Sequence, residues 1–196
     1  MRFLLSLLIL GPCASYAEPS AAPFGIELGK PLPPGFAKKH SCKTKTVAGG
    51  ATTRFCDSAP KRLQGAENYM LLLYKGNVVK VLAVWYFTSD SFGTQLKSKF
   101  ADIKQALAKK GGVTPISDFN FLQAGSIWGE PNEFARALQQ NERHLAVYWS
   151  WPNGVDVSVS SSATTGSDTM MKLVYEHSAL MTAYVAAQKI QDADAL

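Results

Sequence analysis

The sequence predicts an α+β domain: an antiparallel sheet of about five strands, helices packed on one face of it, and a disulfide-pinned hairpin near the N-terminus. Three observations predict this class. Several short runs alternate apolar and polar residues, as strands do. Residues 91–110 carry apolar side chains at helical spacing. The links between these segments are short, which favours antiparallel pairing of neighbouring strands.

The first residues have the three parts of a secretory signal peptide. Arg2 gives a positive start, residues 3–10 are almost all apolar, and the small residues Ser15 and Ala17 precede a cleavage point after Ala17. We therefore expect a signal peptide over residues 1–17, a periplasmic or secreted protein, and one domain over residues 18–196.

Two other interpretations of this leader stay open. It would also suit a buried strand or helix, or a lipidated Cys13, although Pro12 directly before the cysteine departs from the bacterial lipoprotein pattern. No further apolar run approaches the ~18 residues that a membrane-spanning helix needs. The sequence therefore predicts no transmembrane segment in the mature chain.

Cys42 and Cys56 are the two cysteines that remain after cleavage, and in an oxidising compartment one disulfide between them is the simplest prediction. Strand-forming residues flank Gly49-Gly50, and a hairpin folded about Gly49 places the cysteines opposite each other. A bridge of this loop size stabilises by roughly 3 kcal/mol in the chain-entropy model. A redox site is not favoured because no Cys-x-x-Cys spacing occurs, and a zinc site is not favoured because only His40 is nearby.

Positive charge is concentrated in and around this hairpin. The stretch from Lys30 to Arg62 holds eight cationic side chains and one acid, and the net charge is +9 over residues 18–110 but −5 over residues 111–196. Such asymmetry indicates partners rather than fold. We expect an envelope protein with an acidic surface, or anionic lipid, and no nucleic acid. The competing interpretation is that the lysines only keep an edge hairpin soluble and unpaired.

A second hairpin is predicted over residues 68–87, where two strand-like runs flank Lys75-Gly76-Asn77. Its second run is apolar on both faces, so we expect a central strand with cover on each side. What covers the second face is not evident from the sequence. The helix of residues 91–110 follows, and Gly111-Gly112 ends it.

The remaining elements are a short helix, a third hairpin, a strand and a terminal helix. Apart from a helix starting near Pro131, residues 113–143 are predicted to be irregular. The later elements are expected at residues 144–151 and 155–162 (a hairpin around Pro152-Asn153-Gly154), 171–176 (a strand) and about 178–191 (a helix).

A search for catalytic motifs finds no nucleophile elbow, no zinc-protease motif and no phosphate-binding glycine loop. His144 and His177 flank strands that would be neighbours in one arrangement, so a two-histidine site with Glu176 is one possibility. Ordinary surface histidines are the simpler interpretation. The sequence therefore predicts no enzyme, no metal and no cofactor.

Aromatic side chains supply the last signal, because consecutive strand residues point to opposite faces. If Trp85 and Trp149 point into the core, their neighbours Tyr86 and Tyr148 point to the opposite face. Exposed aromatic residues mark interaction sites. Cover by residues 113–140 would bury them instead. The predicted binding surface combines the basic hairpin with two aromatic strand positions: Lys43, Lys45, Arg54, Tyr86 and Tyr148.

Five short motifs carry a resemblance: Gly25-Ile26-Glu27-Leu28-Gly29, Tyr74-Lys75-Gly76-Asn77-Val78, Lys109-Lys110-Gly111, Trp149 and Leu173-Val174-Tyr175. With them the chain resembles small exported bacterial α+β proteins of unknown function. It is more loosely similar to the helix-on-sheet modules of outer-membrane assembly lipoproteins and β-lactamase-inhibitor proteins. That resemblance implies binding to other proteins without catalysis.

We therefore expect a non-catalytic binding or interaction module of the inhibitor, immunity or envelope-assembly type. One alternative is a binder of envelope lipid or lipopolysaccharide, with an apolar cavity between the helix of residues 91–110 and the sheet. A second alternative is a hydrolase that uses His144 or His177.

Overall fold

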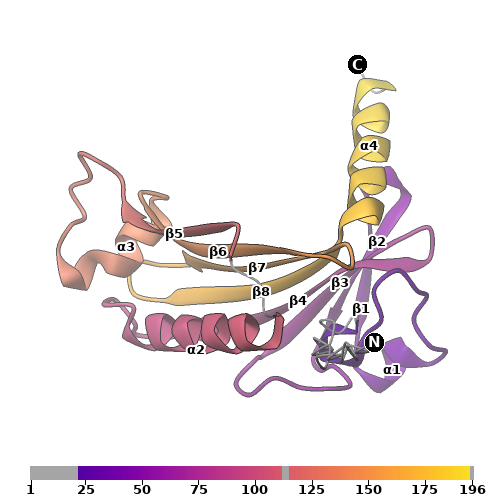
Figure 1. Cartoon of the computed structure of the whole chain (residues 1–196), viewed down its shortest axis with the longest axis horizontal. Helices are drawn as coiled ribbons and strands as arrows, with labels where there is room; N and C mark the ends of the chain where they lie inside the picture. Colours follow the sequence, from indigo (N-terminus) through magenta and orange to yellow (C-terminus); the bar gives the residue numbers. More distant parts are fainter. Residues whose placement is uncertain (1–21, 112–114, 195–196) are drawn as a thin grey trace, which may run out of the picture.

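The computed structural model describes residues 22–111 and 115–194, so the predicted leader lies outside the described residues. Its centre is an eight-stranded antiparallel sheet in the order β1-β2-β3-β4-β8-β7-β6-β5 (Figure 1). The strands are β1 (Lys43–Val47), β2 (Ala51–Cys56), β3 (Asn68–Tyr74), β4 (Asn77–Phe87), β5 (Ser117–Leu122), β6 (Arg143–Trp151), β7 (Val155–Ala163) and β8 (Thr169–His177). The helices are α1 (Phe36–Lys39), α2 (Thr94–Gly111), α3 (Phe134–Gln139) and α4 (Ser178–Asp194), with short 3-10 turns η1 (Pro23–Gly25), η2 (Ala48–Gly50) and η3 (Pro131–Glu133).

The sheet consists of two four-stranded meanders. Strands β1 to β4 pair in chain order, and so do β5 to β8. One antiparallel pair, β4 with β8, joins the two halves. In Figure 1 the strands β5 to β8 run across the view while β2 rises steeply, which shows the strong twist expected of a sheet of this width.

The predicted hairpins and the disulfide are confirmed. Cys42 and Cys56 are bonded, directly beyond the Lys43–Phe55 pair of the β1–β2 ladder. Lys75 and Gly76 both have positive φ values, 50° and 81°. A two-residue hairpin turn of this conformation matches the twist of the flanking strands, which explains why this pair closes β3 and β4.

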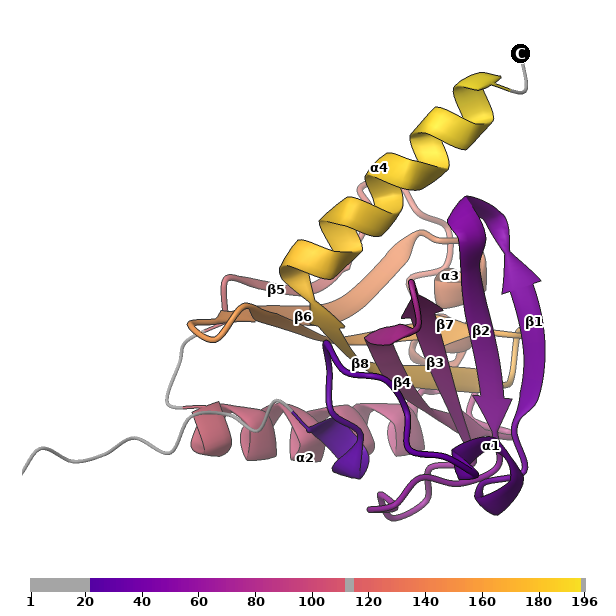
Figure 2. The ribbon, with the colours of Figure 1, turned by 90° about the vertical axis from the view of Figure 1, so that its right-hand side faces the viewer.

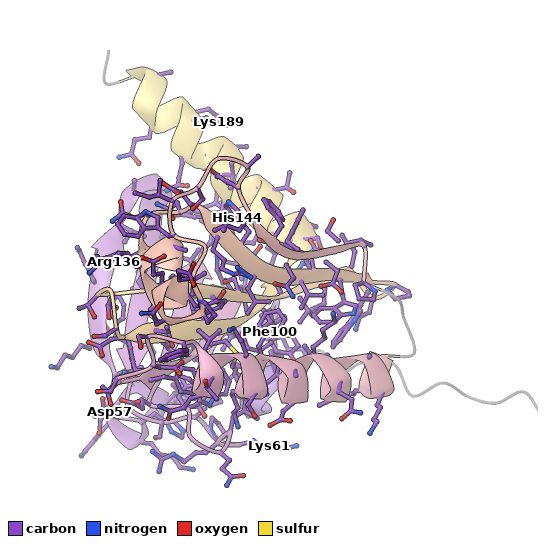
Figure 3. The ribbon with its side chains drawn as sticks, turned by 90° about the vertical axis from the view of Figure 1, so that its left-hand side faces the viewer. Asp57, Lys61, Phe100, Arg136, His144 and Lys189 are labelled. Carbon is purple, nitrogen blue, oxygen red and sulfur yellow. A yellow bond between two sulfur atoms is a disulfide. The ribbon has the colours of Figure 1, made fainter. Side chains whose placement is uncertain are left out.

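The main core lies between the sheet and the helices α2 and α3. The α2 side chains Leu96, Phe100 and Leu107 are buried in one cluster with Trp85 and Trp149. Figure 3 shows the labelled Phe100 in the layer between α2 and the sheet. The alternation predicted for the aromatic strands is therefore confirmed, because both tryptophans face the helices.

The expectation that the helices pack on one face is wrong. α4 packs on the opposite face, where its Tyr184 joins a cluster with Leu72, Tyr74 and Val79, and Figure 2 shows α2 and α4 on opposite sides of the sheet. A register shift between Leu72 and Leu73 moves Val79 to this face. Helical spacing identifies α4 as a helix but carries no information about which sheet face it covers.

The expected number of strands is also wrong, because the sheet has eight strands and not five with a separate hairpin. The stapled hairpin belongs to the same sheet, since β2 pairs with β3 from Ala51–Tyr74 to Cys56–Tyr69. The eighth strand, β5, falls in the segment predicted to be irregular. It has no buried apolar side, because Phe119 and Phe121 on one side remain exposed.

Candidate functional site

One face of the sheet, on the side away from α2, is only partly covered by α4. We call the part that α4 leaves uncovered the open face. The strand registers place one continuous row of its side chains across seven strands. The row consists of Lys43, Phe55, Met70, Leu82, Val174, Ser158 and Tyr148. At the usual strand spacing this row is roughly 29 Å long, which is wide enough for a protein-sized partner.

The floor of the open face is apolar. Leu82, Val84 and Val174 form a cluster of their own, against which Met70 and Met170 pack. All five residues come from the strands β3, β4 and β8. The three central side chains are themselves buried, so Met70 and Met170, which are only partly buried, are the members of this cluster that a partner could contact.

Aromatic rings lie on both sides of this floor along the sheet, on β2 and β4 and on β5 and β6. They are exposed to between 39% (Tyr148) and 48% (Phe55). The Phe119 ring lies edge-on to the Tyr148 ring at a centroid distance of 6.1 Å, and the Phe121 ring lies 4.8 Å from the His144 ring. A hollow of about 280 Å³ runs beside these rings, and Figure 3 shows the labelled His144 on the side of the sheet away from α2. The aromatic members of the open face are Phe55, Tyr86, Phe119, Phe121 and Tyr148.

The charge of the open face is positive. Lys43 and Lys45 stand on the edge strand β1 and Lys172 on β8, and within the described ranges none of the three has a salt-bridge partner. Lys80 is neutralised by Glu176 at 2.5 Å. Asp156, which accepts a hydrogen bond of 2.7 Å from the Ser150 hydroxyl, is the remaining acid on the described strands of this face.

The structure places four of the five predicted surface residues on the open face: Lys43, Lys45, Tyr86 and Tyr148. Arg54 is not brought together with them, because it lies between Thr53 and Phe55 and so points to the other face. There it lines a groove of about 610 Å³ with Lys38 and Lys75.

Sequence reasoning missed three aromatic residues of this face, Phe55, Phe119 and Phe121. The alternation in SDFNFL, residues 117–122, was the signal that could have revealed the last two.

The histidines do not form a common site. His177 of β8 pairs with Val155 of β7, and Val155 pairs with Trp151 of β6. His144 lies on β6, seven residues before Trp151. At the usual rise per residue the two histidines are offset by roughly 23 Å along the strands, and β7 lies between the strands that carry them. Glu176 is engaged by Lys80. The two-histidine arrangement with Glu176 is therefore not formed.

His40 has a structural environment. Its Nδ1 lies 3.0 Å from the Ser58 hydroxyl and its ring lies 4.5 Å from that of Phe36. Burial, with a smaller contribution from the charge of Lys39, lowers the pKa of His40 below its ordinary value. In the part of the chain that the structure describes, no cluster of three or more His, Cys, Asp or Glu side chains is arranged to hold a metal ion.

Comparison of the chain with protein-family models, with curated proteins and with solved structures gives no match. Of the helices within residues 22–111 and 115–194, none has the length and apolar character needed to cross a membrane.

Proposed function

We propose that the protein is a non-catalytic interaction module of the cell envelope, and that its open face binds a partner protein with an acidic surface. One observation carries this proposal: five partly exposed aromatic rings share a single sheet face with three lysines, Lys43, Lys45 and Lys172, that have no salt-bridge partner among the described residues. Large exposed apolar patches are uncommon on monomeric proteins and mark interaction sites. The Cys42–Cys56 disulfide supports an oxidising compartment.

The two kinds of side chain have different roles in this proposal. Aromatic side chains at the centre of an interface supply most of the binding free energy, because they bury large areas at a small cost in side-chain entropy. The lysines raise the association rate with an acidic partner and select it over other proteins, but salt screens them. We therefore expect binding that weakens moderately, and is not abolished, as salt increases.

Site-specific photocrosslinking in the producing cells tests the proposal. A photoreactive phenylalanine analogue replaces Tyr148 at the open face or, as a matched control, Phe92, which is 53% exposed and follows β4 in the loop before α2. The expected result is one protein, identified by mass spectrometry, that crosslinks from position 148 and not from position 92. Equal crosslinking from both positions, or crosslinking to lipid alone, would overturn the proposal.

The purified partner is then titrated against substituted variants. Tyr148→Ser with Tyr86→Ser, and separately Lys43→Glu with Lys45→Glu, are each expected to weaken binding at least tenfold, which corresponds to about 1.4 kcal/mol. The controls are Phe92→Ser and Lys109→Glu, since both residues are exposed and lie off the open face. Unchanged affinity in the tyrosine variant would contradict the assignment of the face.

A further inference from the structure

We infer a second ligand site on the opposite side of the sheet, a pocket for a single-chain anionic amphiphile of the fatty-carboxylate class. The pocket has a volume of about 310 Å³ and lies where α2, β8 and the segment around η1 meet. This inference does not rest on the proposed function, because the two sites are on different faces and share no residue.

The walls of the pocket are apolar. Ile103 and Leu107 of α2 face Leu173 of β8, and the Phe24 ring packs edge-on against the Tyr175 ring at 5.5 Å. Phe24 has a φ of 55°, an uncommon conformation for a residue with a side chain, and in it the ring forms part of the wall. The Tyr175 phenol is neutral at ordinary pH, and burial raises its pKa further, to about 12. The walls therefore present no charge to a ligand.

Three cations stand at the pocket and come from two separate segments. Lys61 and Arg62 belong to the loop between β2 and β3, and Lys110 belongs to the last turn of α2. Figure 3 labels Lys61 on the side of the sheet where α2 lies. The loop is held in place because the Lys61 amide donates a hydrogen bond of 2.8 Å to the Phe24 carbonyl. None of the described residues that line the pocket is acidic.

This combination of walls and charges selects the class of ligand. A volume of about 310 Å³ is at the lower end of the roughly 300–1,000 Å³ that is usual for small-molecule pockets. A ligand body with several polar groups would lose their hydrogen bonds to water against these walls, which is costly. An alkyl chain has no such groups, and a carboxylate at its end would meet the three cations.

Isothermal titration calorimetry with sodium decanoate, below its micelle-forming concentration and at low ionic strength, tests the inference. We expect one decanoate per chain. Because one buried methylene contributes about 0.8 kcal/mol, hexanoate is expected to bind on the order of a hundredfold more weakly or more. Decanol, which has the chain without the charge, is expected to bind at least fivefold more weakly than decanoate.

Paired substitutions on α2 locate the site. Ala106 lines the pocket and Ala108 does not, and both are exposed. Ala106→Trp is expected to abolish decanoate binding, and Ala108→Trp to leave it within twofold. Lys110→Glu is expected to weaken decanoate about fivefold and to leave decanol unchanged, whereas the neighbouring Lys109→Glu has a smaller effect on decanoate.

Three results would each overturn the inference: no binding of decanoate, binding that Ala106→Trp leaves unchanged, and equal affinity for decanoate and decanol. The open-face variants Tyr148→Ser and Lys43→Glu are carried through the same titrations. They are expected to bind decanoate as the unsubstituted protein does. Failure of this site and failure of the proposed protein interface are thus distinguishable.

Discussion

Tyr184 of α4 packs against Tyr74 of β3 with their ring centroids 5.6 Å apart, and this contact fixes the C-terminal helix to the sheet. Further along α4, the Gln191 side chain accepts a hydrogen bond of 2.5 Å from the Gly49 amide at the tip of the β1–β2 hairpin. The C-terminal helix α4, which follows the second meander, therefore contacts the β1–β2 hairpin of the first meander.

Replacing Tyr184 with alanine should release α4 from the sheet. Truncation of a buried aromatic residue in a full core costs about 3–5 kcal/mol, and we expect the lower end of that range because this cluster is small. Hydrogen exchange followed by mass spectrometry should show faster exchange in α4 and in the hairpin tip, with β6 and β7 unchanged. Val185→Ala, on an exposed position of the same helix, is the control, and equal exchange in both variants would contradict the role of Tyr184.

Removing the disulfide should lower stability without changing the fold. The double variant Cys42→Ser with Cys56→Ser is expected to lose about 3 kcal/mol of unfolding free energy, because the unfolded chain regains the freedom that the bridge removes. Urea denaturation measures this loss. A reducing agent should lower the midpoint of the unsubstituted protein and leave that of the double variant unaltered. A shift of equal size in both would mean that the agent acts elsewhere.

Asp90 should be a major contributor to the start of α2. Its carboxylate is buried and accepts hydrogen bonds from the amides of Gln95 (3.0 Å) and Leu96 (3.1 Å) and from the Thr169 hydroxyl (2.9 Å). Hydrogen bonds to charged groups contribute about 1.5–3 kcal/mol, so Asp90→Ala is expected to cost about 3 kcal/mol. Asp102→Ala, at an exposed position of α2, should stay within about 0.5 kcal/mol in the same urea titration.

The buried His40 should make stability depend on pH. Burial lowers its pKa in the folded protein below the ordinary 6.5, so the unfolded chain binds the proton more readily than the folded one. This part of the stability is fully present above pH 6.5 and decreases as the pH falls below that value. Urea midpoints at pH 7 and pH 5 should differ more in the unsubstituted protein than in His40→Gln. An identical pH dependence in both proteins would contradict the burial argument.

Local patterns predicted most elements of this fold. The α2 stripe of Leu96, Phe100 and Leu107 repeats at helical spacing and is buried. The Lys75-Gly76 turn requires two positive φ values, which restricts the residue types that form it. Both features depend only on residues close together in the chain, so they can be recognised from the amino-acid sequence without an alignment.

Relationships between distant segments were not predictable in this way. For β5, the alternation in residues 117–122 was present in the sequence, but its place at the edge of the sheet and the pairing of Asp118 with Lys104 of α2 depend on distant segments. The face that α4 covers brings together Ala51, Leu72, Tyr74 and Val79 from three strands, and the register shift at Leu72 that moves Val79 there is not visible in any one segment. The separation of Arg54 from Lys43 and Lys45, by contrast, follows from the hairpin alone, because the register that places Cys42 opposite Cys56 pairs Arg54 with Thr44 and so puts it on the other face.

The single β4–β8 pair that unites the two meanders has a consequence for the order of folding. Every other strand pair joins neighbours in the chain, so the loops that each meander must close are shorter than the one between β4 and β8. Pairing β4 with β8 closes the long loop between Phe87 and Thr169, whose entropic cost is greater. We therefore expect each meander to form before the two meet. Before β4 and β8 pair, Leu82 and Val84 of β4 are not yet packed against Val174 of β8. These apolar side chains could then associate with other chains.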